Sequence, residues 1–191
     1  MKNKILFGLL AVFTVLSAVR CDFFTRKCPP CPPSGCCIDF DTAPFVAGTT
    51  YSTVGAPVAA VCDFDVTIDN LISGGTPYFN FGKVEPATST FGSGNVFNTN
   101  NVTLKFKNTK AGTSTVTMEY QDMGGTANLS VNGILFSGKL NAAPASLGGV
   151  SVSVFTTSIT GGQNGFIKLK GVIKDFSIGG QEFHLDDICR R

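Results

Sequence analysis

The chain has 191 residues, of which 43% are hydrophobic and 15% are charged, and its formal net charge is +2 at pH 7. Without Lys2 and Lys4, which precede an apolar run, 13 of the 15 basic residues remain, against 13 acidic residues. This balance gives no broad electrostatic attraction for nucleic acid or an anionic membrane surface. We therefore expect no nucleic-acid partner, and membrane contact only through a lipid anchor.

The first residues have the pattern of a secretory signal peptide. Lys2 and Lys4 precede the apolar run 5–16, which is too short to span a bilayer comfortably, and small residues allow cleavage after Ala18. We predict that residues 1–18 are a signal peptide and that the protein is secreted or held at the cell surface. The alternative is an N-terminal anchor helix that is never removed.

Residues 19–36 form a tether rich in cysteine and proline, which excludes helix and central strand there. In one interpretation Cys21 is lipidated, which would make the protein an outer-membrane lipoprotein, although Arg20 is a poor residue at that place. The other six cysteines suggest three disulfides, with 15 pairings open. The six are Cys28, Cys31, Cys36, Cys37, Cys62 and Cys189. A zinc site formed by the paired cysteines is the alternative, but exported thiols usually oxidise.

From residue 37 onward the hydrophobic period is two, which predicts one all-β domain over residues 37–191. Apolar and polar residues alternate as in antiparallel strands with one face in water. The clearest such segments are residues 103–107, 115–120, 150–154 and 167–170, and the two ends, 37–41 and 183–189, also have strand character.

Turn signals separate these segments. Asn132-Gly133 lies between two apolar triplets and predicts a type I′ hairpin. Five Gly-Gly pairs, including Gly124-Gly125 and Gly179-Gly180, are expected to separate further strands. The 17 phenylalanines are expected to fill the hydrophobic core between the sheets. We predict an antiparallel β-sandwich of jelly-roll type with nine or ten strands, stapled by disulfides.

Acidic residues beside the terminal cysteines suggest a metal site. If Cys37 pairs with Cys189 and the end strands run antiparallel, Asp39 lies opposite Asp187. Two opposed carboxylates repel each other, and a structural Ca²⁺ between them would remove the conflict. Asp41 and Asp186 are the alternate ligands if the register shifts by one residue. The other interpretation is that these aspartates are solvated strand-end residues or turn caps.

The same two ends carry a resemblance to a family. Asp39-Phe40-Asp41 followed by residues 48–51, and a last strand at 183–188, resemble the ends of calcium-binding, galactose-binding-like β-jelly-roll domains found in carbohydrate-binding modules. The C-terminus, residues 178–189, also resembles that of uncharacterised secreted bacterial proteins. The resemblance implies a structural Ca²⁺ shared by the first and last strands. Sugar sites of that family usually present Trp or Tyr, whereas this chain has no Trp and three Tyr.

Candidate ligand contacts lie in an amide-rich segment, residues 92–101, which is expected to be an exposed loop. Amide side chains can both donate to and accept from sugar hydroxyls. We take Tyr78, Asn95, Asn98 and Asn100 as the candidate ligand-binding residues. An Asn-rich turn cluster without a ligand is the alternative.

No catalytic set is evident in the sequence. His184 is the sole histidine, and we interpret it as an exposed residue of an edge strand, with a metal or acid–base role beside Glu182 and Asp186 as the alternative. We therefore predict a secreted or surface-anchored, non-catalytic binding module for glycan or another extracellular polymer. The alternative is a structural cell-surface protein that self-assembles through exposed edge strands, and the oligomeric state is left open.

Overall fold

The computed structural model describes residues 35–110 and 114–191, and the fold of this part is all-β. It contains one antiparallel sheet of 14 strands and a single 3₁₀ turn, η1 (Leu140–Ala142). None of its described segments is a helix long and apolar enough to cross a membrane. The predicted antiparallel, disulfide-stapled sandwich is confirmed, but the predicted number of strands, nine or ten, was too low. Several of the additional strands have only two or three residues and leave no periodic signal.

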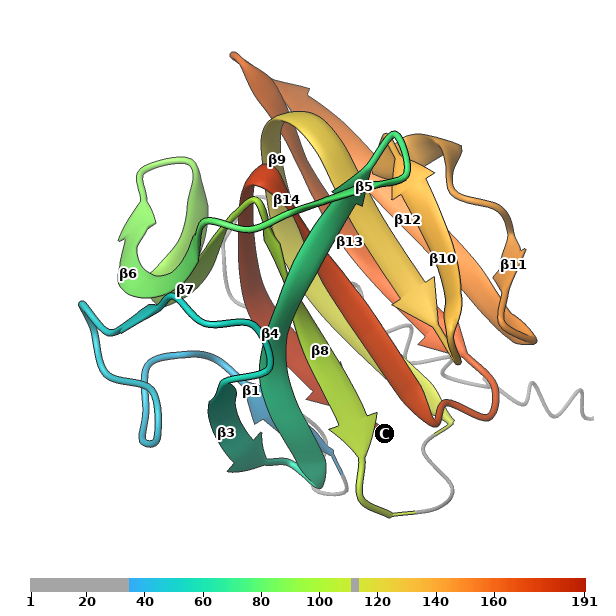
Figure 1. The fold of residues 1–191 in the computed structure, drawn as a ribbon, viewed down its shortest axis with the longest axis horizontal. Helices are drawn as coiled ribbons and strands as arrows, with labels where there is room; N and C mark the ends of the chain where they lie inside the picture. The colour runs from blue at the N-terminus through green and yellow to red at the C-terminus, as the bar shows by residue number, and fades with distance from the viewer. Residues whose placement is uncertain (1–34, 111–113) are drawn as a thin grey trace, which may run out of the picture. The chain divides into compact units, whose positions relative to one another are not determined.

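Two long neighbouring strands form the spine of the sheet (Figure 1). They are β9 (Thr115–Val131) and β14 (Asp175–Arg190), which pair along most of their lengths. Each strand changes its second partner halfway. β14 pairs first with β8 (Val102–Asn108) and then with β7 (Phe91–Asn100). β9 pairs first with β13 (Gly162–Lys170) and then with β10 (Ile134–Gly138).

The sheet therefore has two wings that share β9 and β14. The β8 wing continues from β8 into β4 (Phe64–Ser73), which pairs with β3 (Pro57–Val61) and β5 (Thr76–Tyr78). The β7 wing continues on one side into β6 (Phe81–Thr88) and β2 (Thr50–Tyr51), and on the other side through β13 into β12 (Val150–Ile159) and β11 (Ser146–Leu147). β1 (Cys36–Ile38) pairs with the end of β14.

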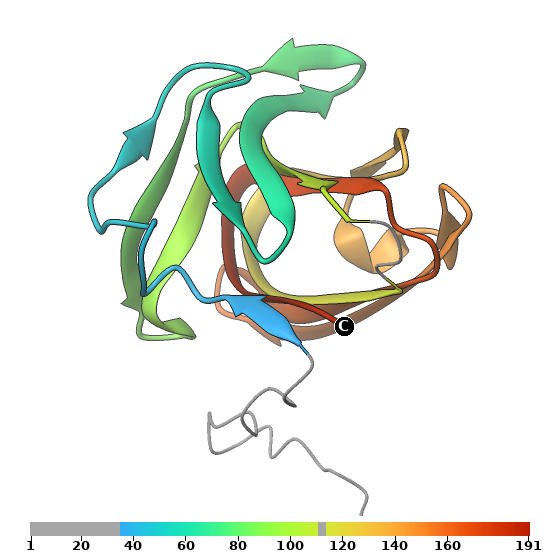
Figure 2. The same cartoon turned by 90° about the horizontal axis from the view of Figure 1, so that it is seen from below.

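The wings curve toward each other and enclose one hydrophobic core (Figure 2). A Cβ atom added to Gly82 of β6 would lie 2.7 Å from Ile68 Cδ1 of β4, so strands of opposite wings meet there. The predicted phenylalanine core is confirmed. Phe106 and Phe176 stack with ring centroids 4.5 Å apart, and Phe64 meets both rings edge-on.

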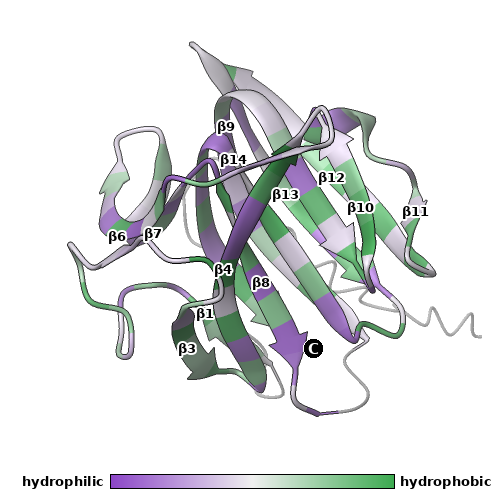
Figure 3. Ribbon diagram, viewed as in Figure 1, coloured by the Kyte–Doolittle hydropathy of each residue, from purple (hydrophilic) through white to green (hydrophobic). Residues whose placement is uncertain are grey.

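The alternation in the sequence matches burial in the structure, and it is visible along the strands in Figure 3. Leu104, Met118 and Ile167 are fully buried, whereas Lys105 and Lys168 on the same strands are exposed. The predicted hairpin is also confirmed, because Asn132 and Gly133, between β9 and β10, both have positive φ (49° and 80°).

Two predicted turn signals lie inside strands instead. Gly124-Gly125 is within β9 and Gly179-Gly180 is within β14, each at the point where the strand passes from one wing to the other. A Cβ atom on Gly179 would lie 2.2 Å from the Val102 carbonyl oxygen, so the close approach of β8 requires glycine there. The register of β14 against β9 also shifts between Gly180 and Glu182.

The segment 92–101 is also not the exposed loop that its composition suggests. Residues 91–100 form β7, and Val96, Phe97 and Thr99 within it are buried. The amides that made the segment look like a loop hydrogen-bond across the sheet instead. Asn98 Nδ2, for example, donates to Glu85 Oε1 at 2.8 Å.

Candidate functional site

The chain ends meet as the sequence predicts. Cys37 and Cys189 are opposite each other in the β1–β14 pair and form a disulfide with an S–S distance of 2.07 Å. Cys36, one residue before the predicted domain start, pairs with Cys62. The predicted disulfide residues Cys28 and Cys31, and the lipidation candidate Cys21, lie outside the described residues.

The four predicted metal-ligand aspartates gather at this end. Continuing the β1–β14 register by one residue places Asp39 opposite Asp187. The Asp39 carboxylate accepts the Asp41 N–H at 3.1 Å and the Thr42 hydroxyl at 3.3 Å. The Asp41 carboxylate accepts the Asn95 N–H at 2.5 Å. Two of the four carboxylates therefore hold neighbouring backbone or side-chain donors.

Asp186 is the most deeply buried member of this acidic group, with 2% of its surface exposed. Its carboxylate accepts the N–H groups of Ser93 at 3.1 Å and Asp187 at 2.9 Å. Burial, together with the neighbouring Asp187 and Glu119 carboxylates, raises the pKa of Asp186 to about 8. Burial and then the Asp39 and Asp41 carboxylates also raise the pKa of Asp187.

The arrangement favours a role for the aspartates in capping the backbone. Among residues 35–110 and 114–191, no group of three or more His, Cys, Asp or Glu side chains is placed to hold a metal ion. The carboxylate oxygens described above are instead directed at N–H groups of β7 and of the chain ends. The bound Ca²⁺ stays a prediction.

His184 lies on the central strand β14, so its interpretation as an exposed edge residue is wrong. Its side chain is 13% exposed and its Nε2 lies 3.2 Å from Glu85 Oε1. Asn98 on β7 and Gln121 on β9 are its cross-strand neighbours. The alternating sequence of β14 does not show that the strand is central, because an edge strand and a central strand with one polar face have the same pattern.

The neighbours proposed for His184 do not join it in one site. Glu182 lies at the register shift of β14, whereas Asp186 is covered by Ser93 of β7. The two acidic residues therefore have different surroundings from the histidine, which is turned toward Glu85.

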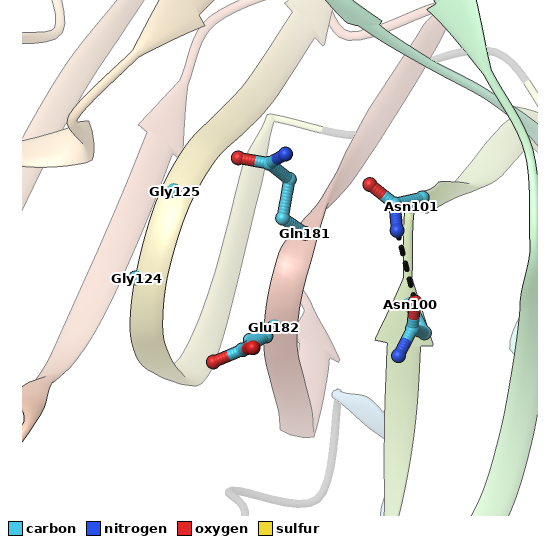
Figure 4. A pocket seen from close by; sticks show the side chains of 6 residues that line it. All are labelled: Asn100, Asn101, Gly124, Gly125, Gln181 and Glu182. Carbon is cyan, nitrogen blue, oxygen red and sulfur yellow. Dashed lines mark hydrogen bonds between the residues drawn. The ribbon is translucent and has the colours of Figure 1, made fainter.

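An open polar depression of about 280 Å³, called the amide cavity below, lies beside the register shift of β14 (Figure 4). Its lining combines amide, carboxylate and glycine residues from three strands or their ends: Asn100, Asn101, Gly124, Gly125, Gln181 and Glu182. The cavity lies at the switch between the wings, where Gly124 of β9 leaves open space and the Gln181 side chain packs against Gly125. A Cβ atom on Gly125 would lie 2.1 Å from Gln181 Oε1.

Part of the polar lining is held in place within the protein. Gln181 Oε1 accepts the Thr126 N–H at 2.8 Å, and Asn100 Oδ1 accepts from Asn80 Nδ2 and Asn101 Nδ2, both at 3.0 Å. Within the described residues, the other polar atoms of these amides and the Glu182 carboxylate make no hydrogen bond. The cavity therefore presents oriented donors and acceptors together.

A second depression, of about 300 Å³, is lined by β4, β8, the first half of β14, the end of β9 and the start of β10. Two of its charged lining residues form an ion pair with each other, because Lys105 Nζ lies 4.0 Å from Asp69 Oδ2. We therefore take the amide cavity, whose carboxylate is unpaired in the described structure, as the candidate functional site.

The structure does not bring the four candidate ligand residues together. Asn100 lines the cavity, but Asn98 is bound to Glu85 and Asn95 Nδ2 donates to the Phe40 carbonyl at 3.4 Å. Tyr78 is 47% exposed on β5 and is not part of the cavity lining. Gln181 was missed by sequence reasoning. A glycine pair interrupting a strand pattern just before Gln181 is the signal that would have found it.

Protein-family models, curated proteins and solved structures were compared with this chain, and no match was found. The candidate site therefore rests on its own geometry.

Proposed function

We propose that the chain is a non-catalytic glycan-binding module, secreted or anchored at the cell surface, and that the amide cavity holds the sugar. The observation that carries this proposal is the pairing of fixed amides with an unpaired carboxylate in one cavity. A sugar hydroxyl both donates and accepts a hydrogen bond, and a mixed lining of this kind satisfies both roles.

Two amide side chains that are fixed by hydrogen bonds within the protein support a binding role for the cavity. Asn100 and Gln181 each use one side-chain atom inside the protein, which fixes the direction of the other atom. Preorganised groups lose less conformational freedom when a ligand binds. Gly124 adds backbone that a sugar ring can approach closely, since it has no Cβ atom and the space beside it is open.

The disulfides and the apolar leader support the location. Cys36–Cys62 and Cys37–Cys189 are typical of an oxidising compartment. The predicted signal peptide, and the alternative in which Cys21 is lipidated, concern residues outside the described structure.

The test is a glycan array probed with the full chain, followed by calorimetric titration of the best ligand. Glu182→Ala and Gln181→Ala should each weaken binding about tenfold, because each removes hydrogen bonds to the ligand. Asn98→Ala is the matched control, since this amide faces Glu85 outside the cavity, and it should leave the affinity within about twofold.

Two outcomes would reject the proposal. One is an array with no bound glycan, in buffer with Ca²⁺ and in buffer with EDTA alike. The other is a ligand whose affinity responds to Asn98→Ala and not to the cavity variants. Binding that needs Ca²⁺ and is lost in Asp39→Ala would add the predicted ion to the proposed module.

A further inference from the structure

The outer strand β12 leaves a long stretch of its edge unpaired in the described structure. On one side it pairs with β13 along residues 151–159. On the other side β11 covers only Val150 and Ser151, and the Val152 N–H donates to the Ala145 carbonyl at 2.9 Å. Beyond residue 152, no described strand lies on that side. Figure 1 shows the β12–β13 hairpin (orange) projecting at the top of the view.

The hydrogen bond of Val152 shows in which direction the unpaired N–H and C=O groups of β12 point. Its N–H points away from β13, and successive residues of an antiparallel strand alternate in this respect. The N–H and C=O groups of Val154, Thr156 and Ser158 therefore point to the open side. Those of Phe155 and Thr157 point to β13.

The open edge lacks the features that normally prevent strands from pairing between molecules. Several other edge strands of the described structure carry proline, as at Pro57 in β3 and Pro77 in β5, or are very short, as in β2 (Thr50–Tyr51). Residues 150–159 contain no proline, glycine or charged residue. Such an edge is a ready template for another strand.

We propose that β12 pairs with β12 of a second copy of this chain, antiparallel about a twofold axis through Thr156. In this register Thr156 faces Thr156 of the second copy, and Val154 faces Ser158. Each open N–H then meets an open C=O, because the edge is self-complementary under the twofold rotation. The absence of charge means that no like charges are opposed.

The exposed aromatic residue of β12 supports this occupant. Phe155 is 61% exposed, and its ring centroid lies 6.3 Å from that of Phe166 on β13. In the proposed register Phe155 lies beside Thr157 of the second copy, on the same face of the joined sheet. Pairing therefore covers a large apolar side chain that the single chain leaves in water. The inference is independent of the proposed glycan site.

The experiment is sedimentation equilibrium of the full, disulfide-bonded chain over a concentration series. We expect a monomer–dimer equilibrium. Thr156→Pro should raise the dimer Kd at least about tenfold, because it removes an N–H at the centre of the pair that β13 does not use. Thr156→Lys should act in the same direction by opposing two like charges, and it keeps the backbone intact if the proline variant folds poorly.

The matched control is Val172→Lys, which removes another exposed apolar side chain, 71% exposed, away from the edge. It should leave the Kd within about twofold. Amide hydrogen exchange gives a second readout: the amides of Val154, Thr156 and Ser158 should become protected as the concentration rises, while those of Phe155 and Thr157 are protected throughout.

Three results would overturn the inference. A chain that stays monomeric at the highest concentration has no such pair. A dimer that Thr156→Pro leaves intact uses another surface. Protection of Val154, Thr156 and Ser158 in the dilute monomer would mean that another segment of the same chain already covers the edge.

Discussion

The two ends of the β7 wing differ in how many of their polar groups have hydrogen-bond partners. At the chain-end region, formed by β1, the last residues of β14 and the start of β7, a disulfide joins the strands and aspartates accept N–H groups from β7. At the β12–β13 hairpin, the outer edge of β12 beyond residue 152 has no partner strand in the described structure. The contrast places a cross-link and satisfied polar groups at the chain ends, and unpaired backbone groups at the hairpin.

Loss of the disulfide between the chain ends should cause the largest loss in the free energy of unfolding. The Cys37→Ser/Cys189→Ser variant opens a link across 152 residues, which the chain-entropy model values at about 5 kcal/mol. Cys36→Ser/Cys62→Ser opens a link across 26 residues and should cost less, about 3.5 kcal/mol. Urea unfolding of both variants measures the difference. Equal losses would contradict the special role given to the chain-end link.

A phenylalanine of the chain-end region should matter almost as much. Phe97 is fully buried between Phe40, at 5.5 Å between ring centroids, and Tyr51, at 5.7 Å. Phe97→Ala should lower the free energy of unfolding by about 3–5 kcal/mol through lost burial and the remaining cavity. The same urea titration measures it. A loss below about 1 kcal/mol would show that this end is loosely packed.

The buried Asp186 should make stability depend on pH. The folded protein keeps the Asp186 proton up to about pH 8, whereas an unfolded aspartate releases it near pH 4. The free energy of unfolding should therefore fall as pH rises from about 4 to 8, by at most about 1.4 kcal/mol per pH unit, and level off above 8. The raised pKa of Asp187 acts in the same direction.

Thermal unfolding of the wild type and Asp186→Asn between pH 5 and 9 measures this slope. The variant cannot ionise at this position and should show a flatter profile. A wild type whose midpoint is constant from pH 5 to 8, or a slope that persists unchanged in Asp186→Asn, would contradict the account.

The smallest effect is expected at the hairpin. Phe155 is the same residue type as Phe97 but is 61% exposed. Phe155→Ser should change the free energy of unfolding of the monomer by only about 0.5 kcal/mol. Measured at low protein concentration, a loss of several kcal/mol would mean that the hairpin is covered and would remove the contrast between the two regions.

Much of the fold follows from patterns that involve only neighbouring residues. Alternation identified the strands that bury Leu104, Met118 and Ile167, because period two places every second side chain on the core face. Asn132-Gly133 identified its hairpin because both residues tolerate positive φ. The assumed Cys37–Cys189 pair fixed a register that the structure also has.

The candidate site did not follow from such patterns, because long-range pairing creates it. Gly124-Gly125 and Gly179-Gly180 have the composition of turns, and only the partners of β9 and β14 show that they are crossing points within strands. His184 likewise has an edge-strand pattern in a strand that lies at the centre of the sheet. The cavity at Gln181 results from the wing switch, which no single segment encodes.

The central claim is that the amide cavity binds a glycan, and chemical-shift mapping by NMR tests it most directly. The isotope-labelled full chain would be titrated with the glycan that binds best on the array. We predict that the largest shifts occur at the amides of Asn101, Gly124, Gly125 and Gln181, and that Glu182→Ala needs about tenfold more glycan to reach them. Shifts centred on Phe155 and Phe166, or no shifts at saturating glycan, would contradict it.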